Sequence, residues 1–179
     1  KANQPFGVLP VLVEKSGDGS PDFIVGQSGT IERYLARKFG FLPADLKQAA
    51  LQEQFHDQGA DMFLSYYASL FAPESVKADK TKAFEANLEK FASAQTDLLV
   101  SNGNNGYLFG DSFSYADAVS YGYYQHLLTE TTKHRADIVE FVSSKLSPEI
   151  IKHFATIESD PAVEKQTTKT PSIAALVQA

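Results

Sequence analysis

Hydrophobic residues in the first quarter of the chain occur in two short runs rather than at helical spacing. One β-rich run covers residues 6–14 and a second covers residues 22–26. Two glycines around an aspartate lie between them, within residues 15–21, which is a strong turn signal. Pro10 interrupts the first run, and because proline lacks a ladder donor it belongs at a sheet edge or at the start of a strand. The pattern predicts a β-hairpin.

After Gly26 the hydrophobic period changes to that of a helix. Tyr34 and Leu35 fall at helical spacing and Gly40 closes the segment, which predicts a helix over residues 30–38. Strand signals then disappear. Amphipathic patterns predict further helices over residues 46–71, 80–100, 114–128, 136–144 and 149–157. The chain is therefore predicted to be an α+β protein whose strands are confined to its N-terminal part.

Composition narrows the classes of function. Hydrophobic residues make up 43% of the 179 positions, which is typical of a globular protein. The formal net charge of -6 argues against nucleic acid as a partner, because phosphate binding needs a clustered basic surface. The absence of cysteine excludes disulfides, thiolate nucleophiles and cysteine metal sites within these residues, and it suits a cytoplasmic protein. No apolar run approaches the roughly 20 residues that span a membrane, so no membrane contact is expected.

The histidines and tyrosines do not indicate a catalytic site. The four histidines are dispersed without metal-ligand spacing, so no metal site is predicted; they are His56, His126, His134 and His153. Tyrosines gather in two places, at residues 66–67 and 121–124. Tyrosines at helical spacing usually belong to a core or line a cleft, with the hydroxyl satisfied. We therefore interpret both groups as structural, with some members available to line a substrate pocket.

An ordered set of motifs carries the strongest signal in the sequence. Residues 6–10 read Phe-Gly-Val-Leu-Pro, residues 27–36 begin Gln-Ser-Gly-Thr, and residues 49–51 are followed by Asp57 and Asp61. This set resembles the cytosolic glutathione transferases, in particular the pi, sigma and related tyrosine-type classes. The resemblance implies the last part of a thioredoxin-like, glutathione-binding domain over residues 1–42. An all-helical domain over residues 43–179 would follow it.

The resemblance implies glutathione-binding roles for two pairs of residues. Leu9 and Pro10 match the family's cis-proline corner, where the residue before the proline bonds the cysteinyl backbone of glutathione. Gln27 and Ser28 match the positions that hold the γ-glutamyl carboxylate, and a helix N-terminus attracts such a group through its free amides and its dipole. Simpler interpretations remain open at this point: Pro10 as an ordinary edge-strand proline, and Ser28 as an N-cap.

Two further positions carry weaker implications. Asp61 lies four residues after Asp57, so both side chains share one face of the predicted helix. The family places an acid at the position of Asp61, where it reaches across a dimer interface toward the amino group of glutathione, so a homodimer is implied. A solvated acidic face is the alternative. Lys1 matches a family lysine that pairs with the glycyl carboxylate.

Ser114 and Asp117 form a different kind of motif. A serine followed by an acid at the third helical position can satisfy two unpaired amides reciprocally. Together with Gly110 and Asp111 the pair resembles the folding box of the family. Its role is therefore predicted to be structural, and Asp117 is not a candidate catalytic acid.

The sequence departs from the family at its beginning. A thioredoxin-like domain starts with a β-α-β unit that carries the tyrosine or serine favouring the thiolate of glutathione, so the catalytic residue is expected upstream of Lys1. Either that unit precedes these residues, or the chain is a degenerate homologue completed by a partner. The first expectation is a detoxifying glutathione transferase that joins the thiolate to small apolar electrophiles. The alternative is a non-catalytic assembly module like the one in translation elongation factor 1 gamma.

Overall fold

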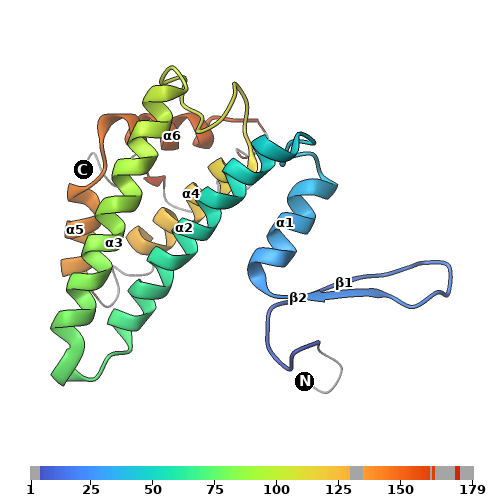
Figure 1. Cartoon of the computed structure of the whole chain (residues 1–179), viewed down its shortest axis with the longest axis horizontal. Helices are drawn as coiled ribbons and strands as arrows, with labels where there is room; N and C mark the ends of the chain where they lie inside the picture. The colour runs from blue at the N-terminus through green and yellow to red at the C-terminus, as the bar shows by residue number, and fades with distance from the viewer. Residues whose placement is uncertain (1–4, 130–134, 162, 164–171, 174–179) are drawn as a thin grey trace. The chain divides into compact units, whose positions relative to one another are not determined.

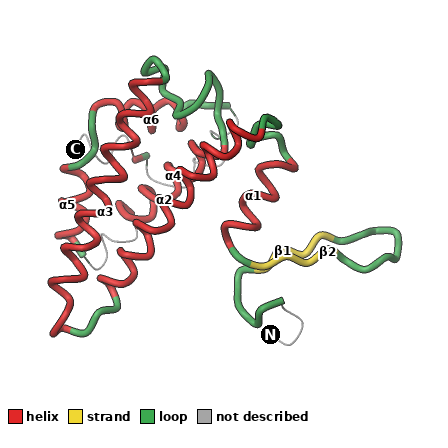
Figure 2. Tube along the Cα trace, viewed as in Figure 1, coloured by secondary structure: helices red, strands yellow, loops and turns green. Residues whose placement is uncertain are grey.

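The computed structural model describes residues 5–129, 135–161, 163 and 172–173. Contacts between residues divide the chain into two compact units, Lys1–Ala49 and Ala50–Ala179. The first unit contains all the strands that the described residues form, and the second is helical (Figures 1 and 2). This arrangement confirms the α+β prediction. The domain boundary at residue 42 stays a prediction.

The first unit begins with the predicted β-hairpin. Strands β1 (Val11–Glu14) and β2 (Phe23–Gly26) pair antiparallel, with Val11 opposite Gly26 and Glu14 opposite Phe23. The ladder starts directly after Pro10, five residues into the β-rich run that the sequence indicated, because the proline nitrogen has no hydrogen to donate.

Helix α1 (Ser28–Lys38) packs on the hairpin of the same unit. The ring of Tyr34 lies 5.0 Å from that of Phe23, and its hydroxyl donates to Glu14 at 2.7 Å. Lys38 also pairs with Glu14, at 2.6 Å. These contacts lower the pKa of the Glu14 carboxyl, first through the hydrogen bond from Lys38. One carboxylate therefore joins the end of α1 to β1.

The second unit consists of long and short helices. Their bounds are α2 (Leu46–Leu70, which begins in the first unit), α3 (Glu74–Ser101), α4 (Tyr115–Thr129), α5 (Ala136–Ser144) and α6 (Pro148–Glu158). The prediction for α3 was wrong at its start, since the helix begins six residues before Lys80. Pro73 stands at its N-cap and Glu74 supplies an acidic side chain to the first turn, where the helix dipole favours one.

Large aromatic side chains fill the core between these helices. Phe84 and Phe91 of α3, Tyr124 of α4 and Phe154 of α6 are completely or almost completely buried. Tyr66 and Tyr121 are buried as well, which confirms the structural interpretation of the tyrosine groups at these positions. Tyr67 lies at the surface, where its ring stacks on that of Phe71. No helix within the described ranges is long and apolar enough to cross a membrane.

Candidate functional site

The end of the hairpin brings two of the predicted binding segments together. Val11 pairs with Gly26 at the end of the ladder, so Pro10 and Gln27 directly follow a paired position on each strand. A Cβ atom on Gly26 would lie 3.9 Å from the carbonyl oxygen of Pro10, so the two segments approach closely. The Leu9–Pro10 peptide bond is cis, as the resemblance implied. Leu9 is 77% exposed and can meet an extended ligand.

Gln27 joins β2 to α1 in an unusual backbone conformation. It has φ 73° and ψ 120° and serves as the N-cap without a capping bond from its side chain. Such values are rare for a residue with a Cβ atom and cost on the order of 1–3 kcal/mol. Ser28 is the first residue of the helix, so the alternative that Ser28 is the N-cap was wrong by one position. Its exposed hydroxyl is therefore not used to cap α1.

The start of α1 has the electrostatics of an anion-binding site. The first turn contains no acidic side chain, while Arg37 and Lys38 occupy the last turn. The first amides of a helix have no partner within it and carry a partial positive charge. The exposed hydroxyl of Ser28 adds one further donor. This corner has the features that a carboxylate-binding site requires, and the exposed Leu9 belongs to the same end of the hairpin.

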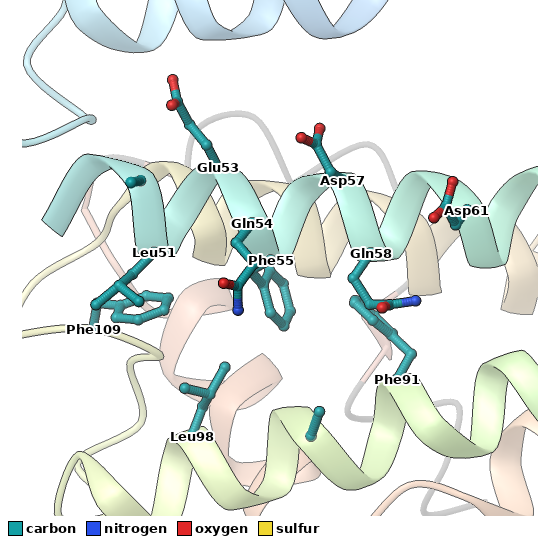
Figure 3. Close-up of a pocket in the computed structure, with 12 residues that line it drawn as sticks. Leu51, Glu53, Gln54, Phe55, Asp57, Gln58, Asp61, Phe91, Leu98 and Phe109 are labelled. Atoms are coloured by element: carbon teal, nitrogen blue, oxygen red, sulfur yellow. The ribbon is translucent and has the colours of Figure 1, made fainter. Parts of the chain in front are cut away.

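Asp61 belongs to the second unit, on the solvent-facing side of α2. It lines a pocket of about 740 Å³ between α2 and α3 (Figure 3). Asp57, one turn earlier, lies in the same lining and accepts a hydrogen bond or ion pair from His56 at 2.9 Å. Both acids are exposed, as the predicted shared face requires. Lys1 lies outside the described residues.

The apolar part of this pocket was missed by the sequence analysis. Phe91 and Leu98 of α3 point toward α2, and Leu51 and Phe109 lie at one end (Figure 3). Glu53 projects away from α3, so the acidic side chains form one edge of an otherwise largely apolar hollow. Leu51 is 45% exposed although its position continues the apolar pattern of α2. An exposed apolar patch of this kind marks an interaction surface.

Asp117 organises the loop before α4 and is completely buried. It accepts the amides of Leu108 and Ser114 at 2.8 Å each and the hydroxyl of Ser114 at 2.6 Å. The box is therefore not the reciprocal pair that the sequence suggested, because the serine hydroxyl donates to the carboxylate. Because the carboxylate is completely buried and no ligand can reach it, the packing supports a structural role for the box.

His153 of α6 faces this carboxylate. Its Nδ1 donates to the carbonyl of Gly106 at 2.9 Å and lies 3.7 Å from Oδ1 of Asp117. Burial lowers the pKa of His153 to about 4. Burial also raises the pKa of Asp117 to about 6, against the hydrogen bonds that its carboxylate accepts. No cluster of three or more histidine, aspartate or glutamate side chains that could hold a metal ion occurs among the residues that the structure describes.

Comparisons with known proteins identify the family of the chain. Residues 60–169, more than half of the chain, match the family described as "Glutathione S-transferase, C-terminal domain". "Probable glutathione S-transferase 6" of Caenorhabditis elegans is 29% identical over 96% of this chain and 78% of its own length. "Probable glutathione S-transferase 9" of the same nematode is 30% identical over 93% of this chain and 76% of its own.

A solved structure extends the likeness to the fold. The monomeric glutathione S-transferase Na-GST-3 of the hookworm Necator americanus is 28% identical, with a TM-score of 0.69 over 95% of this chain and 78% of its own. The sequence likeness thus runs through both units and is not confined to the helical one. The chain belongs to the glutathione S-transferase family.

Proposed function

We propose that this chain binds glutathione at the corner formed by Leu9, Pro10, Gln27 and Ser28. The observation that carries the proposal is the start of α1. There, a strained Gln27 leads into the helix, Ser28 is exposed, and the first turn contains no acidic side chain. A backbone outlier of this type persists where function requires it. The γ-glutamyl carboxylate would lie on α1, and the cysteinyl backbone would pair with that of Leu9.

The activity we propose is the addition of the glutathione thiolate to small apolar electrophiles. The thiol of a free cysteine has a pKa near 8.5, so an enzyme must favour the thiolate near neutral pH. Binding the tripeptide along a fixed corner then holds the sulfur beside the electrophile, which replaces a bimolecular encounter by a positioned one. The activating tyrosine or serine is not assigned to any position of residues 1–179. A cytoplasmic location and a role in detoxification accompany this proposal.

We also propose a tyrosine-type class, a homodimer, and a contact of Asp61 with the amino group of glutathione from the partner. The exposed acid at the edge of a largely apolar pocket supports the last two, since a second copy would cover the pocket and the amino group of its glutathione would neutralise the acid. A lysine at residue 1 would pair with the glycyl carboxylate. Na-GST-3 is described as monomeric, so the oligomeric state is a property to measure within this family.

Retention on immobilised glutathione tests the binding proposal. The wild-type protein is expected to bind and to elute with free glutathione, and Ser28→Ala is expected to weaken retention. Losing one hydrogen bond to a charged group costs about 1.5–3 kcal/mol, which is roughly a ten-fold to hundred-fold loss of affinity. Ser20→Ala, an exposed serine in the hairpin turn of the same unit, is the matched control and should bind like wild type.

A conjugation assay with a chromogenic aryl halide separates the two functional alternatives. Binding together with turnover supports a transferase. Binding without turnover in the full-length protein favours the non-catalytic assembly module. If wild type passes through the glutathione column unretained, or if Ser20→Ala loses as much affinity as Ser28→Ala, the proposed corner is not the binding site.

A further inference from the structure

The loop after α3 contains two asparagine–glycine dipeptides, Asn102–Gly103 and Asn105–Gly106. Asparagine is among the thermolabile residues. Before glycine it is most exposed to attack by the next backbone nitrogen, because glycine has no Cβ atom to obstruct the approach. The same loop therefore contains two chemically equivalent dipeptides for this reaction, and their hydrogen bonds in the structure differ.

The first difference concerns the attacking nitrogen. The amide of Gly103 donates to the carbonyl of Val100 at 3.0 Å as α3 ends, so its hydrogen is engaged. Within the described ranges no group accepts a hydrogen bond from the amide of Gly106. Only the second dipeptide has an uncommitted backbone nitrogen next to the asparagine side chain.

The second difference concerns the carbonyl that would be attacked. Oδ1 of Asn105 accepts the amide of Tyr107 at 3.0 Å and Nδ2 of Asn102 at 3.3 Å. The bond to Tyr107 folds the side chain back over its own backbone, in the manner of an Asx turn. Donors aimed at a carbonyl oxygen stabilise the negative charge that develops there when a nucleophile adds. Asn102 instead directs its Nδ2 toward the carbonyls of Tyr107 and Gly110.

We propose that Asn105 is a site of spontaneous deamidation. The nitrogen of Gly106 forms a bond to Cγ of Asn105, the Cγ–Nδ2 bond breaks, and the departing amino group leaves as ammonia with the hydrogen of the Gly106 amide. Water then opens the resulting five-membered imide at either carbonyl, giving aspartate or isoaspartate at position 105. The side chain of Asn105 is exposed, so solvent supplies that water. No oxidation or reduction is involved.

The modification changes a contact that holds the loop. Nδ2 of Asn105 donates to the carbonyl of Gly110 at 2.7 Å. In the product a carboxylate faces that carbonyl, and two acceptors repel each other. The turn held by this bond carries Leu108, whose amide donates to Asp117, and Phe109, which lines the pocket between α2 and α3. Deamidation therefore loosens the folding box and one end of the pocket.

Ageing of the wild-type protein tests the site. The folded protein is incubated at mildly alkaline pH, digested, and its fragment ions are read for replacement of an amide by an acid at each asparagine. Conversion at Asn105 is expected to be about five-fold or more faster than at Asn102, because freeing the Gly103 amide costs about one net hydrogen bond. In denaturant the two rates should become equal. Equal rates in the folded protein, or no conversion at Asn105 while the denatured chain reacts, would overturn the proposal.

Substitution tests the consequence. Asn105→Asp reproduces one product and is expected to lower the Tm. Ser112→Asp adds the same charge at an exposed position of the same loop and serves as the control, with a smaller expected change. If both variants lower the Tm equally, the contact with Gly110 does not hold the loop, and that part of the proposal fails. The ageing experiment uses only the wild-type chain and stands even if Asn105→Asp does not fold.

Discussion

The backbone conformation of Gln27 and its side chain can be tested separately, the first for its effect on stability and the second for its contact with glutathione. The residue has φ 73° and ψ 120°, and its side chain makes no capping bond to α1. Glycine adopts these angles without steric cost, whereas alanine keeps the cost and removes only the side chain. A comparison of the two substitutions therefore measures strain and side-chain contact independently.

We expect Gln27→Gly to stabilise the fold, and Gln27→Ala to leave it nearly unchanged. Relief of about 1–3 kcal/mol of strain is offset by about 0.5–1 kcal/mol of added freedom in the unfolded chain, for a net gain of about 1 kcal/mol. Both variants should retain less glutathione than wild type if the Gln27 side chain touches the ligand. Urea midpoints give the stability, and a lower midpoint for the glycine variant would show that Gln27 is not strained.

Asp117 and His153 form a pair of buried groups whose pH dependences oppose each other. Asp117 has a pKa raised from 3.8 to about 6, so its contribution to stability is present at pH 4 and is lost as the pH rises to 6. His153 has a pKa lowered from 6.5 to about 4, so its contribution is present above pH 6.5 and is lost as the pH falls to 4. In the wild-type protein the two pH dependences of the free energy of unfolding therefore largely cancel.

Substituting one member of the pair should reveal how that member's contribution to the free energy of unfolding depends on pH. The destabilisation caused by Asp117→Asn is expected to shrink between pH 4 and 6, and that caused by His153→Gln to grow between pH 4 and 6.5. Each change is limited to about 1.4 kcal/mol per pH unit. Urea unfolding across this range measures both, with the exposed Asp111→Asn as the control variant. Slopes of the same sign for the two variants would contradict the assignment.

The spacing of apolar residues predicted most of the strands and helices. The hairpin and the bodies of the helices followed from the spacing of apolar residues, because those residues form the buried faces. The start of α3 was missed because residues 74–80 are mostly polar or charged, and a helix turn without an apolar face leaves no period to detect. The sequence did not indicate the positive φ of Gln27, since the neighbouring Gly26 and not Gln27 is the residue type that favours it. The pocket could not be foreseen, because it depends on how α2 and α3 are spaced.

The close packing of α2 against α4 depends on Gly59, whose role the spacing of apolar residues did not indicate. A Cβ atom on Gly59 would lie 2.4 Å from the ring of Tyr123, inside any permitted contact. Gly59→Ala is therefore expected to cost about 1–3 kcal/mol through overpacking. Gly122 on α4 has open space around its Cβ position, so Gly122→Ala should instead stabilise by about 0.5–1 kcal/mol.

Thermal or urea unfolding of the two alanine variants checks this difference in sign. The substitution is chemically identical in both, and both sites lie within helices, so helix propensity favours alanine equally. If Gly122→Ala destabilises the protein as much as Gly59→Ala, the close contact between Gly59 and Tyr123 is not the cause of the effect.

For the whole molecule, the proposed glutathione-binding corner and the pocket belong to different units of the chain. The sequence motifs predicted the cis peptide before Pro10 and the helix that begins near Ser28, whereas glutathione binding at these residues stays a prediction. The pocket assembles from α2, α3 and the loop at Phe109, which are distant in sequence. Its largely apolar lining with acidic residues at one edge is the feature that supports association of two copies.

We expect the protein to be a dimer whose interface includes this pocket, and Leu51→Glu to make it a monomer. A stable interface buries about 1,200–2,000 Å² in total, and a new carboxylate at its apolar part would have to be desolvated without a partner. Because Leu51 is 45% exposed, the substitution should change the free energy of unfolding by no more than about 0.5 kcal/mol. Leu64→Glu is the matched control, since Leu64 is 67% exposed on the same helix and lies outside the pocket. Sedimentation should give twice the mass of one chain for wild type and for Leu64→Glu, and one chain mass for Leu51→Glu. If the wild-type protein has the mass of one chain, like the monomeric hookworm relative, it has no partner subunit. The proposed role of Asp61 across a dimer interface would then be wrong.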